Sequence, residues 1–278
     1  MSNHFFVRRV FLLLGMIFLF PGLSSGLEQA KNMATLGLET EYHRYKEDFM
    51  KETGFLSGLN GAYTYHGKIV SENLPNGMFK LEGRIIFGHV NYDGQLFDGR
   101  HYEIKSVRDF TGEIRGLGGY DFSIFSDTTI TPFTGIGYRY LSDDLSKDNA
   151  GYRRHSNYIY SPVGVQTMTP LSNGWSAGVS AEYDIFWHGW QDTYLSDLDP
   201  KFSDMTNDQH HGYGFKTSLQ VRKAMEDKNW IFEPYVHYWD IKNSVFQEAK
   251  YAGAGTGEFF FEPKNSTLEI GMKVGVEF

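Results

Sequence analysis

The C-terminal end of the chain alternates strictly between apolar and polar positions. Every second residue from Leu268 to Phe278 is apolar, and every residue between them, from Thr267 to Glu277, is polar or glycine. Successive side chains of a β-strand point to opposite faces of the sheet, so a period of two predicts a strand with one apolar and one polar face. We therefore expect these last residues to form a two-faced strand that ends in Phe278.

The same alternation recurs along most of the chain. Several of these segments exceed ten residues, whereas strands of soluble proteins average about five or six. About nine to eleven residues, tilted by about 45°, are needed to cross a bilayer. Residues 156–169 alternate poorly, so their facing is left open. The ten expected strands cover residues 34–45, 53–66, 79–87, 108–122, 129–141, 156–169, 175–187, 212–222, 230–241 and 267–278.

The connections between these segments favour an up-and-down order. The seventh and ninth connections, residues 188–211 and 242–264, are long, and the first, third and fifth (46–52, 93–107 and 142–155) vary in length. Three of the even-numbered connections are short, and the second, Gly67 to Gly77, is less regular. Outer-membrane barrels combine short periplasmic turns with longer extracellular loops. We predict an all-β fold, a closed antiparallel up-and-down transmembrane barrel of about ten strands, with eight to twelve as the range.

The composition agrees with a barrel whose faces alternate between lipid and a polar lumen. Aromatic residues make up 17% of the chain, although the mean hydropathy is only −0.40. The absence of cysteine excludes disulfides and thiolate metal sites. The formal charge of −8 argues against nucleic acid as a partner. A soluble lipocalin-like barrel or sandwich is the alternative, since inverting the faces preserves the pattern.

The first 26 residues differ from the rest. Arg8 and Arg9 precede an apolar stretch from Val10 to Leu23, and small residues follow up to Gly26. This order predicts a cleaved secretory signal peptide over residues 1–26, with the barrel domain over 27–278. A permanent N-terminal anchor is the alternative. The arginine pair also matches a twin-arginine signal, but a barrel crosses the inner membrane unfolded, so we expect Sec-type export to the outer membrane.

Five segments carry a resemblance to known proteins. The sequence TPFTGIGYRY of residues 131–140, followed by Ser161-Pro162-Val163-Gly164-Val165, resembles the strand–loop–strand sequences of small bacterial outer-membrane β-barrel proteins. Residues 181–184, 262–266 and the last strand resemble them too. The resemblance runs from about residue 80 onward and implies fold and location, with little chemistry. The strand count is also that of the omptin proteases, but the sequence shows no counterpart of their acidic pair and Asp–His couple.

Aromatic residues are expected where the barrel meets the two membrane interfaces. Trp175 and Trp187 share one strand face twelve positions apart, a spacing that corresponds to roughly 28 Å along the membrane normal. Trp230 and Tyr238 form a shorter pair. We predict these four residues as parts of an aromatic girdle.

The face opposite the apolar one carries charges of both signs. In a narrow barrel they are expected to pair across the lumen as a polar plug that sets strand register; a gated pore is the alternative, although aqueous porins need 16 or more strands. The predicted lumen-facing network comprises Lys80, Glu82, Arg84, Glu113, Arg115, Glu182, Asp184, Lys216, Arg222, Glu233 and His237, and Glu39, Glu41, Arg139, Glu269 and Lys273 belong to the same face.

Two groups of residues raise the question of chemistry. His237, Glu233, Asp184 and His188 are an imaginable catalytic group, but Glu233 and His237 lie about 13 Å apart on one strand, and no nucleophile motif accompanies them. The seventh connection contains five aspartates, at positions 192, 197, 199, 204 and 208, and then His210-His211. Divalent cations are conceivable ligands there, but the spacing matches no fixed metal loop, so we expect a solvated surface loop.

These patterns predict a non-enzymatic, monomeric outer-membrane protein without a cofactor or metal. Its expected surroundings are outer-membrane lipid and lipopolysaccharide, and its long loops serve binding or adhesion to an unidentified extracellular ligand, or the barrel has a structural role. A narrow passive channel for small solutes is the first alternative and an outer-membrane hydrolase the second.

Overall fold

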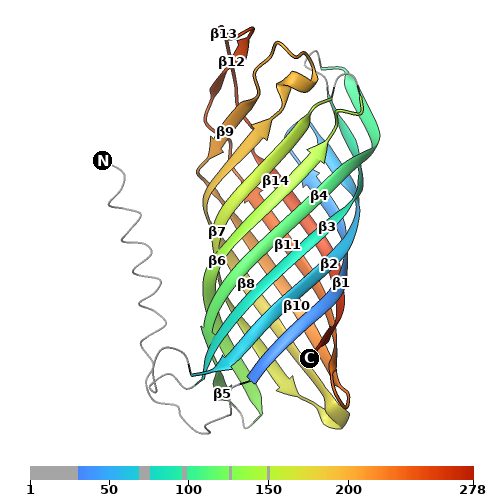
Figure 1. Ribbon diagram of the computed structural model, residues 1–278, viewed down its shortest axis with the longest axis vertical. Helices are drawn as coiled ribbons and strands as arrows, with labels where there is room; N and C mark the ends of the chain where they lie inside the picture. Colours follow the sequence, from blue (N-terminus) through green and yellow to red (C-terminus); the bar gives the residue numbers. More distant parts are fainter. Residues whose placement is uncertain (1–30, 69–75, 96–98, 125–126, 149–150) are drawn as a thin grey trace, which may run out of the picture.

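A computed structural model describes residues 31–68, 76–95, 99–124, 127–148 and 151–278. These residues form a tall closed barrel of ten tilted strands (Figure 1), which confirms the predicted fold class. The segment expected to be the signal peptide, residues 1–26, lies outside the described residues. The barrel strands are β1 (Lys31–Lys46), β2 (Lys51–Gly67), β3 (Gly77–Gln95), β4 (His101–Tyr120), β6 (Thr128–Asp144), β7 (Arg153–Pro170), β8 (Trp175–Thr193), β10 (Gly212–Ala224), β11 (Asn229–Ile241) and β14 (Asn265–Glu277).

Each strand pairs antiparallel with its neighbours in the chain, and the last closes on the first. Strand β14 pairs with β1 over a long register that sets Leu36 opposite Val276. Ala34 and Phe278 exchange two backbone hydrogen bonds of 2.9 and 3.1 Å at the end of this seam. The described residues contain no helix that is both long and apolar enough to span a membrane. Because β14 closes on β1, the first and last residues of the barrel lie together at the end that carries the short connections (Figure 1).

The connections at the opposite end contain further short elements. They are the 3₁₀ turn η2 (Leu195–Asp197), strand β9 (Met205–Gln209), which extends the sheet from β8, and the hairpin of β12 (Gln247–Tyr251) and β13 (Ala254–Phe260). The short-connection end carries β5 (Phe122–Ile124) and the turn η1 (Ser172–Gly174). The third connection is shorter than the predicted 93–107, because β3 extends to Gln95 and β4 already begins at His101. The fifth connection is likewise shorter than predicted because β7 begins earlier, and the seventh because β8 ends later.

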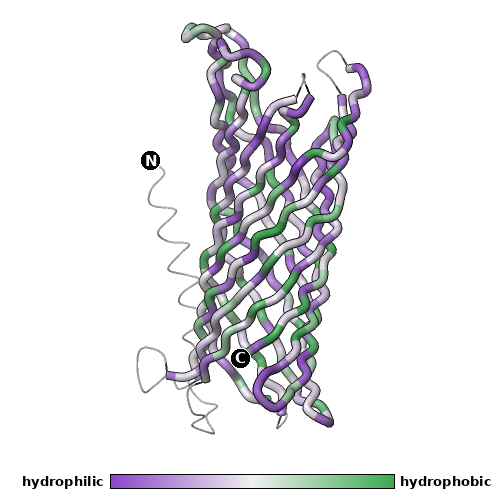
Figure 2. Tube along the Cα trace, turned by 45° about the vertical axis from the view of Figure 1, so that its right-hand side comes forward, coloured by the Kyte–Doolittle hydropathy of each residue, from purple (hydrophilic) through white to green (hydrophobic). Residues whose placement is uncertain are grey.

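Side chains alternate between the outside and the inside of the barrel. Exposed apolar residues such as Leu38, Phe55 and Ile136 cover its outer surface, and apolar and polar positions alternate along the strands (Figure 2). The inside also holds large aromatic side chains beside the predicted charges: Tyr158, Tyr160 and Trp239 belong to one buried cluster. The inward tyrosines of β7 explain why residues 156–169 alternate poorly, since both faces of this strand mix apolar and polar residues.

Two inward tyrosines each lie over a glycine of the neighbouring strand. Tyr160 of β7 is opposite Gly137 of β6, and Tyr235 of β11 is opposite Gly271 of β14. A Cβ atom added at Gly137 would come within 2.3 Å of the Tyr160 ring, and one at Gly271 within 2.5 Å of the Tyr235 ring. Glycine is therefore required at both positions if the tyrosines are to reach across the lumen.

Replacing Gly271 with valine should destabilise the barrel by about 1–3 kcal/mol, because the added side chain displaces the Tyr235 ring. Urea unfolding of the purified protein, followed by its heat-modifiable mobility on a gel, measures this effect. Gly118→Val is the matched control on the outer surface, since a Cβ atom there meets no atom within 4 Å. Equal stability of the two variants would contradict the packing described here.

Candidate functional site

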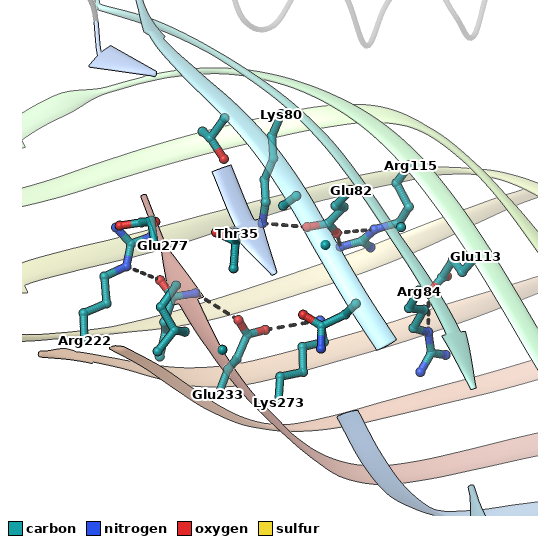
Figure 3. A pocket seen from close by; sticks show the side chains of 18 of the residues that line it. Thr35, Lys80, Glu82, Arg84, Glu113, Arg115, Arg222, Glu233, Lys273 and Glu277 are labelled. Carbon is teal, nitrogen blue, oxygen red and sulfur yellow. Dashed lines mark hydrogen bonds and ion pairs between the residues drawn. The ribbon is translucent and has the colours of Figure 1, made fainter. Parts of the chain in front are cut away.

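The centre of the lumen is occupied by one arginine and four carboxylates. Arg84 points inward from β3. Its Nε atom lies 2.9 Å from Glu113, its Nη2 atom 2.7 Å from Glu269, and its Nη1 atom 3.0 Å from Glu39 and 2.8 Å from Glu41. These carboxylates come from β4, β14 and β1, so a single guanidinium joins β3 to strands on both sides of it in the sheet order. Figure 3 shows Arg84 and Glu113 among the residues that line a pocket of the lumen.

A second set of buried contacts extends this central network. Arg139 of β6 forms an ion pair with Glu269. His237 of β11 lies 3.1 Å from Asp184 and 3.4 Å from Glu269, and the Tyr235 hydroxyl lies 2.6 Å from both Glu39 and Glu41. Together with the Arg84 contacts, these residues form what we call the central network.

The lumen-facing charges nearer the short-connection end form smaller groups (Figure 3). Arg115 contacts both Glu82 and Glu182, and Lys80 lies 2.6 Å from Glu82. The structure thus places all eleven residues of the predicted network inside the barrel. The remaining pairs there are Lys273–Glu233 at 3.7 Å and Arg222–Glu277 at 3.3 Å, and Lys216 forms no ion pair with any described residue.

A third charged group lies at the end of the long loops. Arg154 of β7 contacts Asp143 at 2.8 Å, Glu47 at 2.6 Å and Glu262 at 3.7 Å. Burial and the nearby Glu47 carboxylate raise the pKa of Glu262 to about 8. The sequence did not predict this group, because Arg154 was expected in the fifth connection. The inward direction of Arg154 follows from its position on β7. This signal was not visible in the sequence, because both faces of β7 mix apolar and polar residues.

The proposed catalytic group is only partly assembled. His237 and Asp184 are in contact at the centre of the barrel, with relative exposures of 0%. Glu233 lies elsewhere, bonded to Gln220 and Lys273, and His188 lies on the outside, stacked against His210. The His237–Asp184 couple is an Asp–His pair that the sequence did not show, but the central network encloses it.

The aspartates of the seventh connection do not converge. Asp197 binds Arg153, whose hydrogen bonds lower the pKa of that carboxyl, and Asp199 accepts a bond from Tyr251. Asp204 binds Ser196, and Asp192 binds Thr206. Two groups of three possible metal ligands occur elsewhere among the described residues: Glu41, His43 and Glu269, and Asp93, His101 and Glu103. Arg84 already neutralises the first of these two groups.

The four residues predicted for the aromatic girdle lie on the outer side of the barrel. Trp175 and Trp230 are each 40% exposed, close to the short-connection end. Trp187 donates a 2.8 Å hydrogen bond to Ser161, and the Tyr238 ring lies 6.4 Å from that of Tyr213. Trp187 occupies a bulge of β8, since its neighbours Phe186 and His188 pair with successive residues of β7.

The seventh and ninth connections are joined into one surface, which we call the loop platform (residues 194–211 and 242–264). The Asn207 side chain donates to the backbone oxygens of Val245 and Phe260 at 3.0 and 3.3 Å. The amide of Val245 donates to Asp208, and that of Ala252 to Lys201. The hairpin β12–β13 projects from this platform beyond the rim of the barrel (Figure 1).

Comparison with solved structures identifies the fold. The outer-membrane protease OmpT of Escherichia coli is 8% identical; the match covers 92% of this chain and 98% of OmpT, with a TM-score of 0.57. Lower TM-scores relate the chain to the translocator domain of NalP from Neisseria meningitidis (0.41, 10% identity, 97% and 94% covered) and to Ail of Yersinia pestis (0.29, 11%, 89% and 99%). No family model and no curated protein sequence matches.

The fold is that of the small bacterial outer-membrane β-barrel proteins. This agrees with the resemblance found in the sequence. At 8% identity the likeness to OmpT extends to the fold alone.

Removing the central guanidinium should cost far more stability than removing an exposed one. Arg84→Met leaves four buried carboxylates without their shared cation, for which we expect a loss of about 3–5 kcal/mol. Arg108→Met is the control. Arg108 forms an exposed pair with Asp144, and such pairs contribute about 0–1 kcal/mol. Urea unfolding in detergent compares the two, and similar losses would show that the central network contributes little.

Proposed function

We propose that this protein is a non-conducting, non-enzymatic surface protein that binds an extracellular ligand with its loop platform. The observation that carries the proposal is the central network, which fills the middle of the lumen with mutually bonded side chains. Glu39, Arg139 and Glu269 are exposed by no more than 2%. The barrel then serves as a rigid support, and ligand recognition is left to the loops.

The contacts of Arg84 argue against the channel alternative. A conducting lumen needs a continuous polar path of at least ionic width, whereas this guanidinium is bonded from several sides at distances of 2.7–3.0 Å. Opening such a path requires breaking several buried ion pairs at once, which is costly in a low-dielectric interior. Ion pairs of this kind also fix the strand register.

We expect no stepwise conductance when the purified protein is inserted into planar lipid bilayers. The double variant Arg84→Ala, Glu269→Ala removes two side chains from the middle of the network and should produce small openings if the folded barrel still inserts. A known porin measured in the same bilayers is the positive control. Regular openings of the unaltered protein would contradict the proposal and favour a narrow channel.

The loop platform presents apolar surface where water would otherwise be expected. Phe246 is 63% exposed and Phe259 61%, and Phe260 and Phe261 are 37% and 38% exposed. The rings of Phe246 and Phe261 pack 4.8 Å apart. Exposed clusters of large apolar residues mark interaction sites. The hydrogen bonds within the platform hold these rings in place before binding, which lowers the entropic cost of association.

Bacteria that carry the protein should adhere to octyl-coated beads, and the triple variant Phe246→Ser, Phe259→Ser, Phe261→Ser should adhere at least about tenfold less. Each buried phenylalanine contributes about 1.5–3 kcal/mol. Phe49→Ser is the matched control, because Phe49 is 70% exposed in the first connection and outside the platform. Equal amounts of folded protein in the outer membrane are verified for each variant. Undiminished adherence of the triple variant would refute this part of the proposal.

The proposal also includes the way the protein reaches its place. We infer Sec-type export, removal of residues 1–26 and insertion as a monomer among lipid and lipopolysaccharide. The enclosed position of the His237–Asp184 couple supports a structural use of this histidine, since a substrate would have to displace the central network to reach it. Hydrolytic activity that is lost in His237→Ala would count against the non-enzymatic function.

A further inference from the structure

A cavity of about 620 Å³ lies inside the barrel between the central network and the short connections. Its walls include Asn76, Asp127 and Pro170 at the ends of strands, and its depth reaches Glu182 and Lys216. Short connections mark the periplasmic end of an outer-membrane barrel. The cavity therefore belongs to the opposite end of the molecule from the loop platform, and its size is typical of sites for small molecules.

Charged side chains of both signs line the cavity. They comprise five cationic residues and five carboxylates, of which Asp121 and Asp127 come from a short connection. Asp121 is already bonded to His66 and Thr131. The cationic lining residues are Lys80, Arg115, Lys216, Arg222 and Lys273, and the glutamates are Glu82, Glu182 and Glu233.

Lys216 is the cation that this arrangement leaves without a partner. The strand register sets it directly opposite Glu182, but the carboxylate of Glu182 binds Arg115 instead. No carboxylate of the described residues lies within 4.0 Å of the Lys216 ammonium. The Lys216 ammonium lies over the Tyr235 ring, with 5.8 Å between Nζ and the ring centroid. The residue is only 8% exposed, so an unpaired charge here is costly.

A second ammonium group adds to the positive field at this point. Lys273 Nζ lies 5.4 Å from the centroid of the same Tyr235 ring, and its nearest carboxylate, Glu233, is 3.7 Å away. An anion between the two lysines would replace the hydration that burial has removed from Lys216. It would form charge-assisted hydrogen bonds, which are roughly twice as strong as neutral ones.

The wall above the lysines is apolar on one side. Met33, Leu117 and Phe133 line the cavity and are exposed by no more than 7%. Gln166, Ser180 and Ser218 line it elsewhere. A ligand that fits this lining has a single negative charge at one end and a small apolar body at the other.

We propose that the periplasmic cavity binds a small organic carboxylate, whose anionic group pairs with Lys216 beside Lys273 and whose apolar body packs against Leu117 and Phe133. This site is independent of the function proposed for the loop platform, because it lies at the other end of the barrel. Either proposal can fail while the other stands.

Titration calorimetry of the folded protein in nonionic detergent, with benzoate as the probe, tests the site. We expect saturable binding of one benzoate per barrel and at least about tenfold weaker binding of benzamide, which has the same shape without the charge. Lys216→Met should weaken benzoate binding by a similar factor. Lys223→Met is the matched control, since Lys223 lies on the same strand but faces outward, over the Trp175 ring. Equal binding of benzamide, or unchanged binding in Lys216→Met, would overturn the proposal.

A measurement on the unaltered protein covers the case in which Lys216→Met does not fold. Reductive methylation of lysines, read by mass spectrometry of peptides, should be slowed at Lys216 by benzoate and left unchanged at Lys223. Equal rates at Lys216 with and without saturating benzoate would likewise overturn the proposal.

Discussion

Backbone amide and carbonyl groups inside a bilayer have no water to bond, so every one must find a partner within the protein. This chain meets that requirement by pairing β14 with β1, which removes the free edges a sheet would otherwise present to lipid. All other features follow from the closure. It encloses the polar positions of ten strands and brings Phe278 beside Ala34 at the short-connection end. The long connections are then free to form a separate surface beyond the other rim.

The enclosed charges are organised in levels along the barrel. Arg84 and its four carboxylates occupy the middle, Arg154 gathers acidic groups below the loop platform, and the lysines surround the periplasmic cavity. Each buried cation is costly to dehydrate, and the cost is offset where several carboxylates share it. Lys216 differs from the others because its register partner, Glu182, is directed to Arg115. The same principle of pairing thus explains both the filled middle of the lumen and the position of Lys216, which has no ion pair with the described residues.

The two ends of the molecule present different kinds of surface. The loop platform carries aromatic rings held by backbone hydrogen bonds, such as those from Asn207, and suits recognition of an apolar partner. The periplasmic cavity is enclosed, cationic at its floor and apolar on one wall, and suits a small anion. The central network separates them. In the proposed function, the barrel thus supports two surfaces without connecting them.

The sequence by itself determined the architecture. A period of two, repeated over ten segments, identified the strands, and the parity of most of them identified inward charges, because the direction of a side chain in a strand depends on its position. Strand β7 is the exception, since its mixed faces hid the inward direction of Arg154. Tyr235 and Trp239 share a strand face with Glu233 and His237, so their positions in the sequence also indicate that they point inward. Parity could not determine which inward charges pair. Glu182 stands beside Lys216 in the register yet binds Arg115 across the lumen, and Arg84 selects carboxylates from three other strands. Which ion pairs form depends on the curvature of the closed sheet, because it brings strands that are remote in sequence within reach of one side chain. Only the tertiary structure therefore decided that the middle of the lumen is filled, that the seventh and ninth connections join into one platform, and that Lys216 is left facing a cavity.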